Sequence, residues 1–181
     1  ALYFESAMHR AGMSTSDITK ALFMVPVVYA TITFLSGFIA DKAGRKTTVT
    51  LFSATCVTGY ILFVAGILNG WNPYLVGFCC GAFIGSYYST NDVLIMMIGE
   101  SAPTNLRSSA ISAQYIVTAV GFGISLGVGT VCAIKLGNSL IGMATLCMLV
   151  PGFVSALAVL FKNVGETKGI DMDTVTGCEW D

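Results

Sequence analysis

Charged side chains are scarce in this chain. Of its 181 residues, 10% are Asp, Glu, Lys or Arg, whereas about a quarter is usual in soluble domains. So little charge cannot cover a water-facing surface when 55% of the residues are hydrophobic and the mean hydropathy is +0.78. The net charge of −1 also provides no basic surface for nucleic acid, whose binding depends on displacing counterions. The composition therefore excludes a soluble domain and a nucleic-acid-binding protein, and it predicts a polytopic membrane protein in contact with lipid.

Metal-site and disulfide patterns are also missing. The chain has one histidine and six cysteines, and most of these cysteines lie within apolar segments. Thiols in such segments behave as small hydrophobic groups, and their spacing matches neither a zinc site nor a disulfide framework. We expect six free cysteines, no metal and no cofactor. Because neither a signal peptide nor an initiator methionine opens the chain, we also expect it to be part of a longer protein.

Five long apolar segments account for most of the sequence. Each is close to the roughly 20 residues that an α-helix needs to cross a bilayer. They run over Ile18–Ala40, Thr47–Leu68, Pro73–Ile98, Ser108–Ala133 and Asn138–Phe161. Because the connections are short, neighbouring helices must be antiparallel, and we expect an all-α membrane helix bundle over residues 18–161. Residues 1–17 are predicted to be an external segment or the end of a preceding helix, and residues 162–181 a polar tail.

Glycines recur at every fourth position in two of these segments. Gly77, Gly81 and Gly85 share one face of the third segment, and Gly123 and Gly127 share one face of the fourth. Small residues allow helix backbones to approach closely inside a membrane. We expect both stripes to be helix-packing surfaces, with helices that slide during a transport cycle as the alternative.

Four charged side chains fall within six positions between the first two segments. The run reads Gly37-Phe-Ile-Ala-Asp41-Lys42-Ala-Gly44-Arg45-Lys46, and we expect residues 41–46 to form the connecting loop. It resembles the loop signature of the major facilitator superfamily, G-x-x-x-D-[RK]-x-G-R-[RK], at every fixed position. The resemblance implies a membrane transporter and not an enzyme.

Two further charged motifs resemble those of the sugar and metabolite porter branch of the same superfamily. The run Glu100–Arg107 is similar to E-x-x-P-x-x-x-R between helices ten and eleven of that branch, and residues 165–169 are similar to P-E-T-K-G after helix twelve. The resemblance implies that this chain is the C-terminal half of a 12-helix fold, covering about helices 8–12, with the N-terminal half as its partner. Gly165 replaces the family's proline, so we expect charge pairing by Glu166 and Lys168 to remain while local stiffness is lost.

The basic residues predict the orientation in the membrane. Six of them fall on one side of an alternating five-span layout, and Arg10 and Lys135 fall on the other. Since basic residues favour the cytoplasmic side, we expect the signature loop and the tail in the cytoplasm, with the protein in the plasma membrane. The six are Lys42, Arg45, Lys46, Arg107, Lys162 and Lys168.

These motifs place a group of charges at the inner end of the bundle. Charged hydrogen bonds at such a partly dry rim are stronger than neutral ones, but a single exposed pair contributes only ~0–1 kcal/mol, so a network is needed to bias a conformation. The resemblance implies a latch that closes the cytoplasmic side and opens as the two halves rock. The alternative is a set of charges that only fixes the topology. The predicted latch residues are Gly37, Asp41, Lys42, Gly44, Arg45, Lys46, Glu100, Arg107, Glu166 and Lys168.

Asp92 is the acidic residue placed well inside an apolar segment. An ionisable group there costs roughly 2.5–3.5 kcal/mol on insertion scales, so it usually faces a cavity or a partner. Tyr88, Asn91 and Asp92 share a helical face, and we predict that they line a polar pathway, with Gln114 of the next segment as a weaker candidate. Asp92 would carry a proton or pair with a cationic substrate group. The alternative is a protonated or hydrogen-bonded carboxylate that stabilises a helix contact.

The substrate is predicted only as a class. Sugar porters of the superfamily carry a Gly-Pro pair and a tryptophan before the loop glutamate, and residues 91–100 contain neither. By this resemblance we favour a small polar metabolite, such as an organic acid or organic cation, moved together with a proton. The alternatives are a sugar uniporter or symporter, and a membrane receptor or sensor of the same fold that does not transport.

Overall fold

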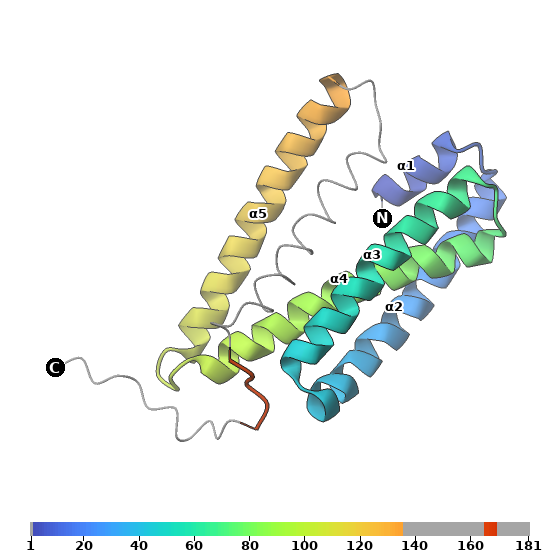
Figure 1. Cartoon of the computed structure of the whole chain (residues 1–181). Helices are drawn as coiled ribbons and strands as arrows, with labels where there is room; N and C mark the ends of the chain where they lie inside the picture. Colours follow the sequence, from blue (N-terminus) through green and yellow to red (C-terminus); the bar gives the residue numbers. More distant parts are fainter. Residues whose placement is uncertain (1, 136–164, 170–181) are drawn as a thin grey trace.

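The computed structural model describes residues 2–135 and 165–169, and these contain α-helices joined by short turns (Figure 1). Four of the helices correspond to the first four predicted spans. The fifth predicted span, Asn138–Phe161, lies outside the described residues. The helices are α1 (Leu2–Arg10), α2 (Thr15–Ala43), α3 (Arg45–Leu68), α4 (Pro73–Ser101) and α5 (Arg107–Lys135).

The connection between α2 and α3 is shorter than predicted. Helix α2 continues through Ala43 and α3 begins at Arg45, so the expected loop over residues 41–46 is wrong. Only Gly44 interrupts the helices, and its φ of 98° lies in a region that glycine adopts without strain. Hydropathy marks where apolar side chains end, but the helical backbone continues into the charged residues on both sides. The charges of the signature therefore stand on two helix ends, where their positions are fixed by the helices.

Two helices begin at residues that suit a helix start. The Ser14 hydroxyl accepts a hydrogen bond from the backbone N–H of Asp17 at 3.2 Å, which caps α2. The Asn72 side chain accepts one from the N–H of Tyr74 at 3.0 Å, and Pro73 occupies the first turn of α4. Proline suits this position because no helical partner exists for its missing N–H. These caps set where α2 and α4 begin.

Helix α4 is the central helix of the described bundle and packs against both α2 and α3. Its glycine stripe faces α2: a Cβ on Gly77 would overlap the backbone of Ala21, and one on Gly81 would lie 2.8 Å from the Val28 side chain. The predicted packing role of this stripe is thus confirmed. Gly123 of α5 is different, because nothing in the described structure lies within 4 Å of its Cβ position.

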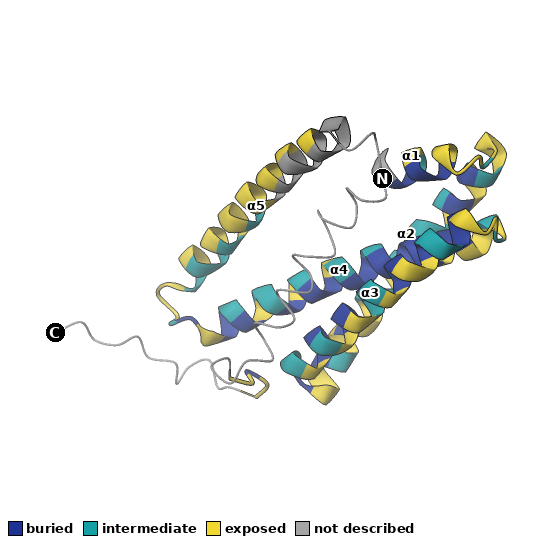
Figure 2. Ribbon diagram, turned by 45° about the horizontal axis from the view of Figure 1, so that its top comes forward, coloured by how far each residue is buried: buried dark blue, intermediate teal, exposed yellow. Residues whose placement is uncertain are grey.

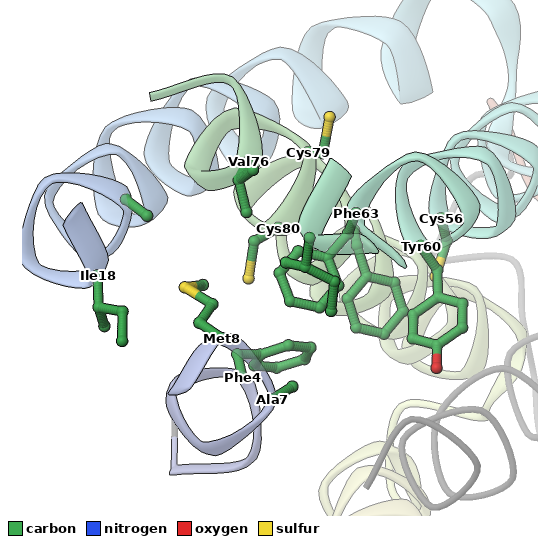
Figure 3. Close-up of a cluster of buried hydrophobic side chains, with 13 residues drawn as sticks. Phe4, Ala7, Met8, Ile18, Cys56, Tyr60, Phe63, Val76, Cys79 and Cys80 are labelled. Atoms are coloured by element: carbon green, nitrogen blue, oxygen red, sulfur yellow. The ribbon is translucent and has the colours of Figure 1, made fainter. Parts of the chain in front are cut away.

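Two groups of buried apolar side chains hold α1 to α4 together. The larger is built from four helices, with Phe4 of α1 resting edge-on against Phe63 and Phe83 at ring distances of 5.5 and 5.6 Å (Figure 3). The smaller joins α2, α3 and α4 near their other end and includes Ala40 and Val49. Burial is concentrated where these helices face one another, whereas much of α5 is exposed (Figure 2). Helix α5 meets α4 near their connecting turn and then diverges from it (Figures 1 and 2).

Among the described residues, α2 and α3 are the helices both long and apolar enough to cross a membrane by length and composition. Helix α4 is as long as α2, with 29 residues, but it carries a polar run around residues 86–92. Because α4 is buried between α2 and α3, many of its side chains contact protein. A helix in that position needs small or polar side chains as much as apolar ones.

Candidate functional site

Arg45 is the centre of a group of charges at one end of the bundle. Its Nη2 lies 2.8 Å from Oε1 of Glu100, and its Nε donates to the same oxygen at 3.2 Å. Its Nη1 lies 2.6 Å from Oδ1 of Asp41, one helical turn back along the chain. Arg45 therefore joins the end of α2, the start of α3 and the end of α4. The side chains of Arg45 and Glu100 are each 11% exposed, whereas that of Asp41 is 70% exposed.

The first turn of α3 is capped by Glu166, which is distant from it in sequence. Glu166 accepts hydrogen bonds from the backbone N–H groups of Arg45 and Lys46 at 2.8 and 3.1 Å. These groups have no partner within their own helix, and a negative charge there also suits the helix dipole. Gly44 leaves room for this contact, since a Cβ at that position would lie 2.9 Å from Glu166 Oε2. The signature glycine and the tail glutamate thus form one structural unit.

The charge state of Glu166 is fixed by this capping. Partial burial alone would raise its pKa, but the backbone N–H groups of Arg45, Lys46, Lys168 and Thr167 outweigh that effect and hold the pKa below the ordinary glutamate value. Hydrogen bonds to the ionised form favour it. Glu166 is therefore an anion over the whole physiological pH range.

The rest of the 165–169 segment makes two further contacts. The Lys168 ammonium donates to the backbone carbonyl of Lys42 at 2.6 Å, at the end of α2. The Thr167 hydroxyl is buried and donates to Oε2 of Glu100 at 2.5 Å. The segment therefore touches α2, α3 and α4 (Figure 1, red). We call the set Asp41, Arg45, Glu100, Glu166, Thr167 and Lys168 the charged rim.

Besides Gly44, four predicted latch residues are not members of the charged rim as defined above. Gly37 is exposed, with nothing in the described part of the chain within 4 Å of its Cβ position, and Lys42 contributes its backbone carbonyl. Lys46 contributes its backbone N–H. Arg107 lies at the start of α5, and its Nε and Nη2 atoms are buried without a hydrogen-bond partner in the described structure.

Sequence reasoning missed Thr167. A threonine in a polar tail carries no signal of burial by itself. Its neighbours do carry one, because Glu166 and Lys168 were both assigned to the rim. Two anchored neighbours place the backbone at residue 167 close to the rim, but they do not predict that its side chain points toward Glu100.

The predicted pathway residues divide between α4 and α5. Tyr88 and Asp92 are exposed on α4, and Asn91 is half-buried beside them. Asp92 takes part in none of the hydrogen bonds or ion pairs of the described residues. Gln114 donates to Thr118 of its own helix at 3.5 Å, so the described contacts do not join it to the α4 group.

The ring of Tyr88 is on the same side of α4 as Asp92, and it contacts two other tyrosine rings. Tyr88 meets Tyr29 of α2 with ring centres 5.8 Å apart, and it meets Tyr87 at 5.4 Å, both edge to face. Tyr88 and Asp92 are four residues apart, so they are neighbours on the helix surface. The arrangement offers a carboxylate one helical turn from an exposed tyrosine ring.

Comparison of this chain with known proteins identifies its family. The chain matches the family model described as "Sugar (and other) transporter" over residues 2–176. It is 29% identical to a facilitated glucose transporter homolog of Caenorhabditis elegans over 80% of the chain and 27% of that relative. It is 25% identical to the alpha-ketoglutarate permease of Escherichia coli over 92% of the chain and 36% of the permease. It is also 34% identical to the sugar transporter ERD6-like 7 of Arabidopsis thaliana over 52% of the chain and 20% of that protein.

The chain thus spans between 20% and 36% of the length of these relatives. No solved structure matches it. The match to the family model covers nearly the whole chain, and the relatives carry transporter and permease names, which agrees with the motifs around Arg45, Glu100 and Glu166. The chain belongs to the sugar (and other) transporter family, as a fragment of a major facilitator superfamily porter.

Proposed function

We propose that this chain is the C-terminal half of a secondary transporter that moves a small polar metabolite across the plasma membrane by alternating access, driven by a proton gradient. The observation that carries this proposal is the charged rim. Three pieces that are distant in sequence meet there: the α2–α3 turn, the end of α4 and residues 165–169. Such a contact can hold one end of a helix bundle closed and release it as a unit.

The rim has the properties that a reversible latch needs. Its central pair, Arg45 with Glu100, is largely shielded from water, so its charged hydrogen bonds are strong. Its outer members, Asp41 and Glu166, are exposed, and water can replace their contacts at small cost. Rocking of the two halves of the transporter would break the outer contacts first and then separate α4 from the α2–α3 turn.

Two substrate classes have support. The lack of a Gly-Pro pair and a tryptophan in residues 91–100 favours an organic acid or an organic cation over a hexose. The names of two relatives favour the second candidate, a sugar uniporter or symporter, whereas the third relative is named for an organic acid. The shared function is uptake of a small polar metabolite.

Transport by the complete protein in proteoliposomes tests the proposal. We expect uptake of a sugar, an organic acid or an organic amine, with accumulation when the outside is made acidic. Arg45→Ala and Asp41→Ala should slow uptake while leaving the amount inserted into the membrane unchanged. Lys20→Ala is the matched control, because it removes an exposed ion pair to Asp17 at 2.9 Å away from the rim, and it should transport normally.

The outcomes separate the alternatives. Normal uptake in both rim variants would reduce the rim charges to topology signals. Absence of uptake for every class, with correct insertion and folding, would favour a receptor or sensor. Residues 1–181 alone should not transport, because they supply one side of the path; uptake by the isolated chain would contradict a site shared between two halves.

A further inference from the structure

No charged side chain among the described residues forms an ion pair with Asp92. It lies in α4 nine residues before Ser101, which at 1.5 Å per residue places it about 13 Å from that end of the helix. Its side chain is exposed in the described structure and takes part in none of its ion pairs or hydrogen bonds. A carboxylate at this depth cannot face lipid without a large penalty. It must face a polar space and a partner that the described residues do not supply.

The residues around Asp92 indicate which chemical class of ligand would bind to it. Tyr88 lies one helical turn away, and its ring plane stands at 85° to that of Tyr29 and at 82° to that of Tyr87. Tyr88 and Tyr29 therefore present ring surfaces in nearly perpendicular directions where α4 faces α2. Tyr87 is on another side of α4 and packs against the larger buried cluster. Tyr88 is 48% exposed, so part of its ring is free for contact. Ring faces carry partial negative charge and attract cations, with quaternary ammonium groups as the best-known case.

We propose that Tyr29, Tyr88 and Asp92 bind an organic cation, a quaternary or protonated amine of about the size of choline. This inference rests on the proposed transport function and names its substrate class. The carboxylate neutralises the charge, and the rings of Tyr88 and Tyr29 contact the methyl or methylene groups next to the nitrogen. An organic anion would add a second negative charge at membrane depth. A neutral sugar would leave the charge of Asp92 without a counter-ion, and a bare proton would make no use of the rings.

Choline and its uncharged isostere 3,3-dimethyl-1-butanol provide the test. The two differ by one positive charge at nearly equal shape. Binding to the purified complete transporter is measured by isothermal titration calorimetry. We expect choline to bind and the isostere to bind at least about tenfold more weakly, since a charge-specific contact of about 1.4 kcal/mol corresponds to a factor of ten.

Substitutions divide the contribution of the carboxylate from that of the rings. Asp92→Asn should abolish choline binding, and Asp92→Glu should retain part of it. Tyr88→Leu should weaken binding about 3- to 30-fold, as expected for a cation–ring contact, whereas Tyr88→Phe should bind within about twofold of the unchanged protein because the ring remains. Tyr74→Leu is the matched control: Tyr74 is 49% exposed on the same helix and lies away from Asp92, so binding should not change.

Counterflow of labelled choline separates the two roles of Asp92. A substrate ligand is needed in every mode of transport, so Asp92→Asn should abolish exchange as well as accumulation. Retained exchange with lost accumulation would assign Asp92 to the proton and overturn the inference. Equal binding of choline and its isostere, or no binding of choline, would overturn it too. Uptake of glucose or alpha-ketoglutarate without choline binding would contradict the inference alone, whereas absence of transport of any solute would contradict the proposed function.

Discussion

Arg45 pairs with two carboxylates that differ greatly in their contact with water. The side chain of Glu100 is 11% exposed and that of Asp41 is 70% exposed. Both lie within 3 Å of the guanidinium, at 2.8 and 2.6 Å, so distance does not distinguish them. Exposure does, because water screens the outer pair and leaves the inner pair in a medium of lower dielectric constant. The free energy of the rim should therefore depend mainly on Glu100.

Paired substitutions test this difference. Glu100→Gln leaves Arg45 without its shielded counter-charge, and removing one partner of a buried pair costs ~3–5 kcal/mol, with a rim position toward the lower end. Asp41→Asn removes an exposed pair and should cost only ~0–1 kcal/mol. Thermal unfolding of the purified complete transporter measures both. Equal destabilisation by the two variants would show that the inner pair is as screened as the outer one.

At the scale of helices, the contact between α2 and α4 depends on the absence of side chains. The positions Gly77, Gly81 and Gly85 meet α2 so closely that Cβ atoms there would overlap it or force it aside. Inside a membrane no hydrophobic force drives helices together, so close backbone packing has to supply the stability. This interface also sets the distance between Tyr29 and Tyr88, and thus the geometry of the proposed cation site.

An alanine at Gly77 tests that interface. Gly77→Ala should separate α2 from α4, because its Cβ would meet the rigid backbone of Ala21, and overpacking of this kind costs ~1–3 kcal/mol or more. Gly123→Ala is the control, since nothing in the described structure lies within 4 Å of its Cβ; there, alanine should be neutral or stabilise the helix by up to ~1 kcal/mol. Unfolding midpoints of both variants give the comparison. A stable Gly77→Ala protein would mean that this packing contributes little.

The sequence predicts the helices well because hydropathy and glycine spacing are local signals. It also indicates which charged motifs belong together, although only by resemblance to a family. It does not predict that Gly44 alone forms the turn between α2 and α3. Hydropathy locates the end of the apolar segment, and the helical backbone continues beyond that point. Nor does the sequence predict that Glu166 caps α3 or that Thr167 is buried against Glu100, because these contacts join residues more than 60 positions apart.

At the scale of the whole molecule, residues 165–169 bind to the first two long helices, although they are far from them in sequence. We call this contact the tie. The tie depends on the negative charge of Glu166, whose pKa is lowered by the backbone N–H groups that it accepts from. A carboxylate with a lowered pKa stabilises the folded state at pH values above its ordinary pKa. That contribution is lost as the pH falls through the lowered value, where the folded state takes up the proton. The ordinary value is 4.5, so the loss should occur below it and the tie should be fully formed at neutral pH.

Thermal unfolding of the complete transporter between pH 3 and pH 7 (a range of about four units around the ordinary glutamate value) tests this tie. Wild-type protein should unfold at a higher temperature than Glu166→Gln above the ordinary value, by a constant margin, because glutamine retains the shape but not the charge. The margin should shrink as acid protonates Glu166. Gly165→Ala is the control: nothing in the described structure lies within 4 Å of that Cβ position, so its margin from wild type should not depend on pH. A margin for Glu166→Gln that stays constant or grows in acid would show that the charge of Glu166 does not hold the end of the chain on the rim.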